Sequence, residues 1–306
     1  MLGRGVVPLT AAAILASALP AAQSDVRTLL AATRTALGGD VVLNSVKAIV
    51  ATGTLSRRLT PVGVSGDVEY DCVLPDQFVR VLHRAVGWYD VSDYAGFNAN
   101  DVIHRTVFPM RTAGRPVVTP VPPVTTPLEA AQEQMTLLRE HRHLFAELTL
   151  PLFGASFDGY PLQFSLRSGL PAPERQVDEL VVTGGDGFTL SLFLDAATHL
   201  PARLTWRASP IVVLGTSSTM VVGPHGRMFD SPAPPTVPSG QSTARLESVE
   251  WQTTFTDYRR VAAFNWPHRF TVAVGGKAYE DLKISNYAIN SAIDPSKFKT
   301  GQQKPQ

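Results

Sequence analysis

The stretch GFTLSLFLDAATHLPARLTW, residues 187–206, decides the fold that the sequence predicts. In its first half the apolar side chains Phe188, Leu190, Leu192 and Leu194 alternate with Thr189, Ser191, Phe193 and Asp195. That two-residue period is typical of a β-strand with one apolar face. The letters DAATH break the alternation before a second mixed run begins at Leu200, so we expect an antiparallel hairpin whose five-residue loop opens at Asp195. A face this apolar has to be covered by another part of the chain, by a lipid bilayer or by an apolar ligand.

Phe193 is the odd residue of this strand, because it is a large aromatic on the face of Thr189 and Ser191. If the leucines face the core, Phe193 lies on the opposite face. It is then either a single exposed aromatic or covered by the proline-rich segment 223–242.

Alternating runs of the same kind recur along most of the chain. In residues 62–84, one predicted face carries Val64, Val68, Tyr70 and Cys72, and the other carries Ser65, Asp67, Glu69 and Asp71. We expect the polar face to meet water. Further strands are expected at 47–58, 87–94, 101–108, 161–168, 177–183, 187–194, 200–207, 211–222, 245–260, 266–274 and 278–289. The pattern predicts a mainly β protein of the α+β class.

Two segments carry the apolar stripe of a helix. The first is 25–38, with Asp25 as its N-cap and a Gly-Gly stop, followed by a short helical turn at 40–46. The second is 128–148, which follows a proline-rich connector. These are the elements available to cover an apolar sheet.

Composition narrows the class of protein. The chain has 306 residues, of which 44% are hydrophobic and 17% charged, so it can bury a sizeable core. Its formal net charge of +1 is too small to attract nucleic acid or an anionic membrane by electrostatics. The sole cysteine, Cys72, has no disulfide partner in the chain and is expected to be a small buried hydrophobe.

The N-terminal residues 1–24 are typical of a secretory signal peptide, with one positive charge, an apolar run and then small residues. We expect cleavage near Ser24, with Ala18 as the other option, and a periplasmic or secreted protein. The remainder is expected to be one domain, 25–300, with insertions at about 115–148 and 223–242 and a polar tail at 301–306. No later apolar run has the length of about 20 residues that a transmembrane helix needs.

Five stretches together resemble a known family. They are ALGGDVVLNSVKAIVATGTL, VLPDQFVRV, GFNANDVIHR, LFLDAATHLPARLTW and NYAINSAIDPSKF, and they occur in the same order over nearly the whole chain. The family is the periplasmic lipoprotein carriers of the Lol outer-membrane lipoprotein-sorting system, and the resemblance is closest to its uncharacterised secreted relatives.

The resemblance implies a single, strongly curved antiparallel sheet, an incomplete β-barrel whose concave face is covered by helices and encloses an apolar cavity for acyl chains. One position departs from the family. The carriers have a basic residue immediately before the proline of the PDQF-like motif, and it helps to hold the lid closed. Here that position is Leu74, which puts regulated opening and hand-off to a receptor in question.

We therefore predict a non-catalytic binding protein that holds a lipid, a fatty acyl chain or a lipidated protein under its sheet. The residues expected to line the cavity are Val68, Tyr70, Leu190, Leu192, Leu194, Trp251, Phe255, Phe270 and Val272. The first alternative is an interaction module whose helices fill the concavity and whose surface loops bind a partner. An outer-membrane barrel is a rival architecture, but the charged strand faces lack an apolar belt between aromatic girdles.

Catalytic motifs give little support to the second alternative, a hydrolase. Ser217 and Ser218 lie near His225, but no strand-turn-helix context activates a serine there. His141 and His143 are two apart on a helix, hence on different faces, whereas a metal pair needs a spacing of three or four. We expect no metal and no cofactor.

Overall fold

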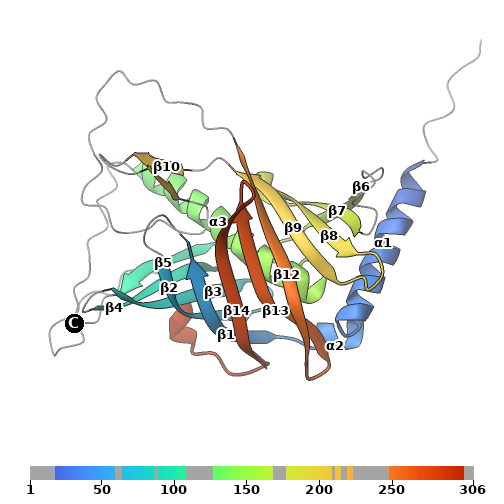
Figure 1. Cartoon of the computed structure of the whole chain (residues 1–306), viewed down its shortest axis with the longest axis horizontal. Helices are drawn as coiled ribbons and strands as arrows, with labels where there is room; N and C mark the ends of the chain where they lie inside the picture. Colours follow the sequence, from blue (N-terminus) through green and yellow to red (C-terminus); the bar gives the residue numbers. More distant parts are fainter. Residues whose placement is uncertain are drawn as a thin grey trace, which may run out of the picture.

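Twelve antiparallel strands form one sheet that bends into an incomplete barrel (Figure 1). The computed structural model describes residues 18–58, 64–86, 89–107, 127–167, 177–208, 211–214, 219–222 and 248–299. The strands of the sheet follow the order β5-β4-β3-β2-β1-β14-β13-β12-β9-β8-β7-β6. They are β1 (Ala48–Arg57), β2 (Val64–Val73), β3 (Gln77–Val86), β4 (Tyr89–Asn98), β5 (Asp101–Val107), β6 (Gln163–Arg167), β7 (Val177–Thr183), β8 (Thr189–Asp195), β9 (Pro201–Ala208), β12 (Val249–Val261), β13 (Phe264–Val274) and β14 (Lys277–Ile289). The predicted fold class is confirmed.

The hairpin at 187–206 forms as predicted, from β8 and β9. Its loop is organised by Asp195, whose carboxylate accepts hydrogen bonds from the backbone N–H groups of Ala197 and Thr198. Leu192 pairs with Leu204 across the two strands, and both are fully buried.

Two glycines of the sheet stand where the backbone of a neighbouring strand lies very close. A Cβ atom added at Gly53 would lie 2.0 Å from the carbonyl oxygen of Lys283, and one at Gly66 would lie 2.0 Å from that of His83. The register between β1 and β14 also shifts at Gly53. Neighbouring backbones approach so closely here that only a residue without a side chain fits.

The helices are α1 (Ala18–Leu37), α2 (Asp40–Asn44), α3 (Pro127–Phe153) and the short 3₁₀ helices η2 (Gly185–Gly187) and η3 (Pro295–Phe298). Two predicted boundaries were wrong. Asp25 does not cap α1, because the helix already begins at Ala18. Helix α3 continues past 148 through Pro151 and ends at Phe153. The next residue, Gly154, has a positive φ of 55° and donates its N–H to the Leu150 carbonyl.

Two strand predictions also need correction. Residues 211–222 do not form one strand, because β10 (Ile211–Leu214) and β11 (Thr219–Val222) pair with each other in a separate hairpin. The polar face of β2 does not simply meet water either. Asp71 is fully buried, because η3 packs on this convex side and Lys297 reaches both Asp71 and Glu69.

A second, smaller core explains that covering. Phe298 of η3 packs on the convex face against Val79, Val81 and Ile103, all of them buried. The backbone of η3 is held by Arg105, whose guanidinium donates to the carbonyls of Lys297 and Lys299. The C-terminal segment is therefore a structural cover for strands β2 to β5.

Several sequence predictions fall outside the described residues. They concern the signal segment up to residue 17, the connector 115–126, the insertion 223–242, the tail 301–306, and Ser217, Ser218 and His225. A transmembrane helix is not found among the helices that the structure describes, since none of them is both long and apolar enough.

Candidate ligand-binding face and its buried polar cluster

The nine residues predicted to line a cavity all lie in one hydrophobic core. They are buried, and they come from β2, β8, β12 and β13, whose inner faces line the concave side of the sheet. Tyr70, Phe270 and Val272 border a small cavity there. The other six pack in the core cluster without bordering it, so their role as ligand-lining residues stays a prediction.

The helices, chiefly α3, cover the concave face (Figure 1). Helix α3 contacts β4 and β5 on one side and β9 and β13 on the other, and α1 packs against α3 and β13. Phe145 of α3 stacks edge-on against Phe78 and Phe97. Near its end, the Leu152 carbonyl accepts a hydrogen bond of 2.9 Å from the indole N–H of Trp266.

The space left between α3 and the sheet is small. The cavity has a volume of about 40 Å³ and is lined by Tyr70, Arg80, Leu144, Glu147, Leu148, Thr253, Phe270, Val272, Glu280 and Leu282. Pockets for drug-sized ligands span roughly 300–1,000 Å³, whereas one water takes about 30 Å³. In this conformation the helix occupies the place that an acyl chain would need.

A larger hollow lies on the opposite, convex face. It has a volume of about 370 Å³ and is lined by Thr54, Leu55, Ser56, Ser65, Gly66, Asp67, Asp281 and Lys283. Hydroxyl and charged groups dominate this lining, so it does not suit an acyl chain.

Charged side chains meet inside the apolar face, at the small cavity. We call Arg57, Tyr70, Arg80, Glu147, Thr253 and Glu280 the interior polar cluster. Arg57 donates from Nε and one Nη to the same oxygen of Glu280, at 2.9 and 2.6 Å. Glu147 of α3 accepts a 2.6 Å hydrogen bond from the indole N–H of Trp206 on β9. The cluster therefore draws its members from five strands of the sheet and from the covering helix.

Burial and charge act against each other in this cluster. Burial opposes the positive charge of Arg57, but the adjacent Glu280 carboxylate more than offsets it, so the guanidinium pKa is raised above its usual value. Burial raises the pKa of Tyr70, which keeps its phenol neutral. Charges buried this deeply carry a large desolvation penalty, which marks the cluster as a candidate functional feature.

Sequence analysis missed this cluster, although one signal was present. Arg57, Arg80 and Glu280 each stand in the apolar phase of their strand, two residues from Leu55, from Phe78 and Leu82, and from Leu282. A charge in that phase is unusual for a strand that only packs a core.

Leu74, which stands where the carriers have a basic residue, packs partly buried against the main core. It brings no charge to the cover. Among the described residues, hydrogen bonds that hold α3 to the sheet run from Trp206 to Glu147, from Trp266 to the Leu152 carbonyl, and from Nδ1 of His141 to the Gly96 carbonyl at 2.7 Å.

In the β8–β9 hairpin the side chains point to the predicted faces of the sheet. Leu190, Leu192 and Leu194 belong to the main core, whereas Phe193 does not. Phe193 is nevertheless only 6% exposed, and the guanidinium of Arg203 lies over its ring at 4.1 Å. The reading of Phe193 as an exposed aromatic is wrong, because a cation from the neighbouring strand covers it.

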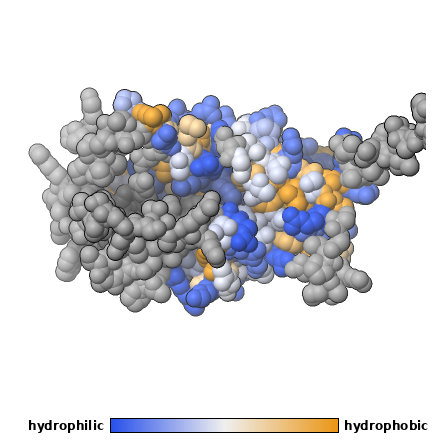
Figure 2. All heavy atoms as spheres, turned by 90° about the horizontal axis from the view of Figure 1, so that it is seen from above, coloured by the Kyte–Doolittle hydropathy of each residue, from blue (hydrophilic) through white to orange (hydrophobic). Residues whose placement is uncertain are grey.

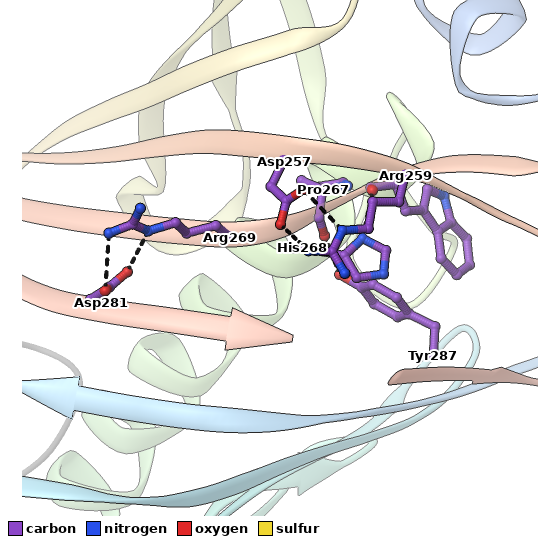
Figure 3. Close-up of polar contacts among 8 residues, drawn as sticks. Asp257, Arg259, Pro267, His268, Arg269, Asp281 and Tyr287 are labelled. Carbon is purple, nitrogen blue, oxygen red and sulfur yellow. Dashed lines mark hydrogen bonds and ion pairs between the residues drawn. The ribbon is translucent and has the colours of Figure 1, made fainter. Parts of the chain in front are cut away.

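Polar residues on β12 to β14 form paired contacts rather than a reactive site (Figure 3). Arg259 donates to both carboxylate oxygens of Asp257, and Arg269 does the same with Asp281. The hydroxyl of Tyr287 donates to the Pro267 carbonyl at 2.7 Å. Across the described ranges no group of three metal-ligating side chains is found.

The fold has similar structures among known proteins, although the sequence matches no family model and no curated protein. The structure is similar to a LolA-superfamily protein from Nitrosomonas europaea, with 8% identity, a TM-score of 0.43, and coverage of 90% of this chain and 97% of that one. It is similar to a DUF1329-family protein from Desulfovibrio piger, with 6% identity, a TM-score of 0.44 and the same coverage.

A third similar structure is an outer membrane lipoprotein-sorting protein domain from Vibrio parahaemolyticus. It has 9% identity and a TM-score of 0.42, with coverage of 89% of this chain and 97% of that chain. Likeness at this level identifies neither a ligand nor an activity.

Proposed function

We propose that the protein is a non-catalytic carrier that binds the acyl chain of a lipid or of a lipidated protein on the concave face of its sheet. The observation that carries the proposal is the cover of that face. A continuous apolar surface is closed mainly by one helix, α3, and the cavity beneath it is only about 40 Å³. An acyl chain therefore binds by replacing the helix rather than by filling a ready cavity.

The energies of such an exchange are balanced. A chain of about fourteen methylenes gains on the order of 11 kcal/mol on burial, at roughly 0.8 kcal/mol each. Helix α3 buries six large apolar side chains, each worth about 1.5–3 kcal/mol. They are Leu144, Phe145, Leu148, Leu150, Leu152 and Phe153. The two terms are of similar size, so a ligand can displace the helix and can also be released.

An apolar surface next to the concave face suits the first contact with a ligand. Figure 2 shows apolar side chains exposed at the end of the molecule where α1 and β6 lie in Figure 1. Leu29, Leu30, Phe164 and Leu166 of these two elements pack only partly buried against the core. We place the entry of the acyl chain there.

The test is a pair of matched substitutions, Phe145→Leu on the buried side of α3 and Phe298→Leu in the convex core. Each is expected to lower the free energy of unfolding by on the order of 1 kcal/mol. Only Phe145→Leu weakens the cover that a ligand has to displace, so it should bind a fluorescent fatty-acyl probe up to about fivefold more tightly than the wild type. Fluorescence titration measures the affinities, and Phe298→Leu should match the wild type.

The opposite result favours the interaction module. If neither the wild type nor Phe145→Leu binds acyl probes, and native mass spectrometry finds no lipid on the purified protein, the carrier proposal is wrong. The filled concavity would then be a packed core, and function would lie in the surface loops.

We further propose that the protein is exported and that residues 25–300 act as one domain. Cleavage near Ser24 would fall inside α1 but would keep Val26, Thr33 and Leu37, the residues of this helix that are buried among those described. Intact mass measurement of the protein from the periplasm or medium should show a chain that starts near Asp25 or, for the other cleavage site, near Ala18. An uncleaved chain in the cytoplasm would contradict export.

A further inference from the structure

The sheet side of the interior polar cluster carries an excess of positive charge. Arg57 on β1 and Arg80 on β3 are both buried, and Glu280 on β14 is the carboxylate that the sheet contributes to the described cluster. Arg57 directs two of its N–H groups at Glu280. The sheet therefore holds two guanidiniums and one carboxylate within an apolar face.

The second carboxylate of the cluster comes from the covering helix. Glu147 of α3 is buried and borders the same cavity as Arg80. With the helix in place, the cluster has two charges of each sign. Glu147, and His143 at 3.7 Å from it, belong to the element that a ligand displaces. When α3 leaves, the sheet is left with one positive charge in excess, which is costly in an apolar environment.

Hydrogen-bond donors surround the place of that excess charge. Thr253 is 3% exposed, borders the cavity, and its Oγ1 makes no hydrogen bond within the described part of the chain. The phenol of Tyr70 borders the cavity as well. A guanidinium beside hydroxyl donors suits a negatively charged oxygen, because hydrogen bonds to an ionised acceptor are the strong ones. Phe270 and Val272 continue the apolar face on which a hydrocarbon chain would lie.

We propose that an anionic group at the polar end of the ligand takes the place of Glu147, with Arg80 and Thr253 as its partners, so that the protein prefers anionic acyl ligands to neutral ones. The proposal rests on the proposed carrier function and names its substrate class. The shared chemistry is a single negatively charged oxygen group next to an acyl chain, either the carboxylate of a fatty acid or the phosphate of a monoacyl phospholipid.

The experiment compares matched anionic and neutral ligands by displacement of a fluorescent acyl probe at pH 8. Dodecanoate is paired with its methyl ester, and lauroyl lysophosphatidylglycerol is paired with monolauroylglycerol. The members of a pair share one acyl chain, so the cost of displacing α3 cancels in the ratio of their affinities. In at least one pair the wild type should bind the anion about tenfold more tightly, which is the effect of one charge-assisted hydrogen bond. The pair that shows the preference identifies the carboxylate or the phosphate.

Four variants assign the preference to the cluster. Glu147→Gln weakens the cover only, so it should bind both members of a pair more tightly at an unchanged ratio. The double variant Glu147→Gln, Arg80→Gln removes one charge of each sign, and its ratio should fall to about one. Thr253→Val keeps the shape and loses the donor, and should lower the ratio about threefold. Arg269→Gln is the control, because the Arg269 side chain is 48% exposed and pairs with Asp281, and it should keep the wild-type ratio.

The outcomes separate this inference from the carrier function. If the wild type binds both neutral ligands as tightly as their anionic partners, the inference is overturned and the carrier function stands. If the double variant keeps the ratio of Glu147→Gln, Arg80 is not the partner of the anion, and the inference is overturned as well. If no ligand binds any of these proteins, the carrier function fails and this inference fails with it.

Discussion

Replacing Lys297 with Met is expected to lower the free energy of unfolding by about 2 kcal/mol at pH 7.5. The ammonium group of Lys297 lies 2.8 Å from Oδ2 of Asp71 and 2.7 Å from Oε1 of Glu69. Asp71 is fully buried, and its other oxygen has no hydrogen bond among the described residues. Removing the lysine therefore leaves a buried carboxylate without its counter-charge.

The same substitution is expected to be much milder at pH 5. Burial raises the pKa of Asp71 to about 6; the hydrogen bond from Lys297 opposes this shift, and the neighbouring Glu69 carboxylate adds to it. A raised pKa means that the neutral form is favoured in the folded protein. The associated stability is fully present below about pH 4 and is lost as the pH rises through 6. At pH 5 most Asp71 is protonated and needs no counter-charge.

Urea unfolding at pH 7.5 and pH 5 measures both effects. Lys283→Met is the matched control, because the Lys283 side chain is 63% exposed and its nitrogen lies 3.8 Å from Asp281, an arrangement worth under about 1 kcal/mol. The double variant Asp71→Asn, Lys297→Met should recover most of the lost stability at pH 7.5. Equal losses for the two lysine variants, or a loss at Lys297 that does not shrink at pH 5, would show that Asp71 is not buried as a charge.

Lowering the pH should lower the free energy of unfolding by weakening the contact between α3 and the sheet. The substitution His141→Asn should remove most of this pH dependence. Burial lowers the pKa of His141 to about 3, the neighbouring His104 and the charge of Arg80 act in the same direction, and the hydrogen bond to the Gly96 carbonyl opposes them. A histidine with a lowered pKa is neutral in the folded protein. The stability linked to it is present above about pH 6.5 and is lost as the pH falls from 6.5 towards 3.

The expected size follows from the shift. Between pH 7 and pH 4 the wild type should lose about 3 kcal/mol more than His141→Asn, at roughly 1.4 kcal/mol per pH unit below 6.5. Asparagine keeps a side-chain N–H for Gly96 but does not titrate, so the comparison isolates protonation. Chemical unfolding at both pH values gives the two slopes. His83→Asn, at an exposed histidine, is the control for the substitution itself, and a wild-type slope in His141→Asn would refute the argument.

Much of this fold can be predicted from local patterns in the sequence. The alternation at 187–206 predicts the β8–β9 hairpin, its loop at Asp195 and the inward direction of the leucines, because all three depend only on backbone geometry over a few residues. The end of helix α3 cannot be predicted in this way, because the residue that usually stops a helix, Pro151, lies inside it. Helix α3 passes Pro151 and ends at Phe153, just before Gly154, because the apolar residues around the proline gain more free energy by packing than the proline costs.

The order of the strands decided which residues that are far apart in the sequence come into contact. Arg57 and Glu280 stand 223 residues apart and meet because β1 pairs with β14, and Lys297 reaches Asp71 because η3 returns over β2. Side-chain alternation states which face a residue takes, and it carries no information on which strand lies beside it. The sequence by itself therefore determined an apolar-faced antiparallel sheet with helices to cover it. Only the tertiary structure decided that charges meet inside that face and that the helix fills it, because burial, pairing and cavity volume arise from contacts that no local period encodes.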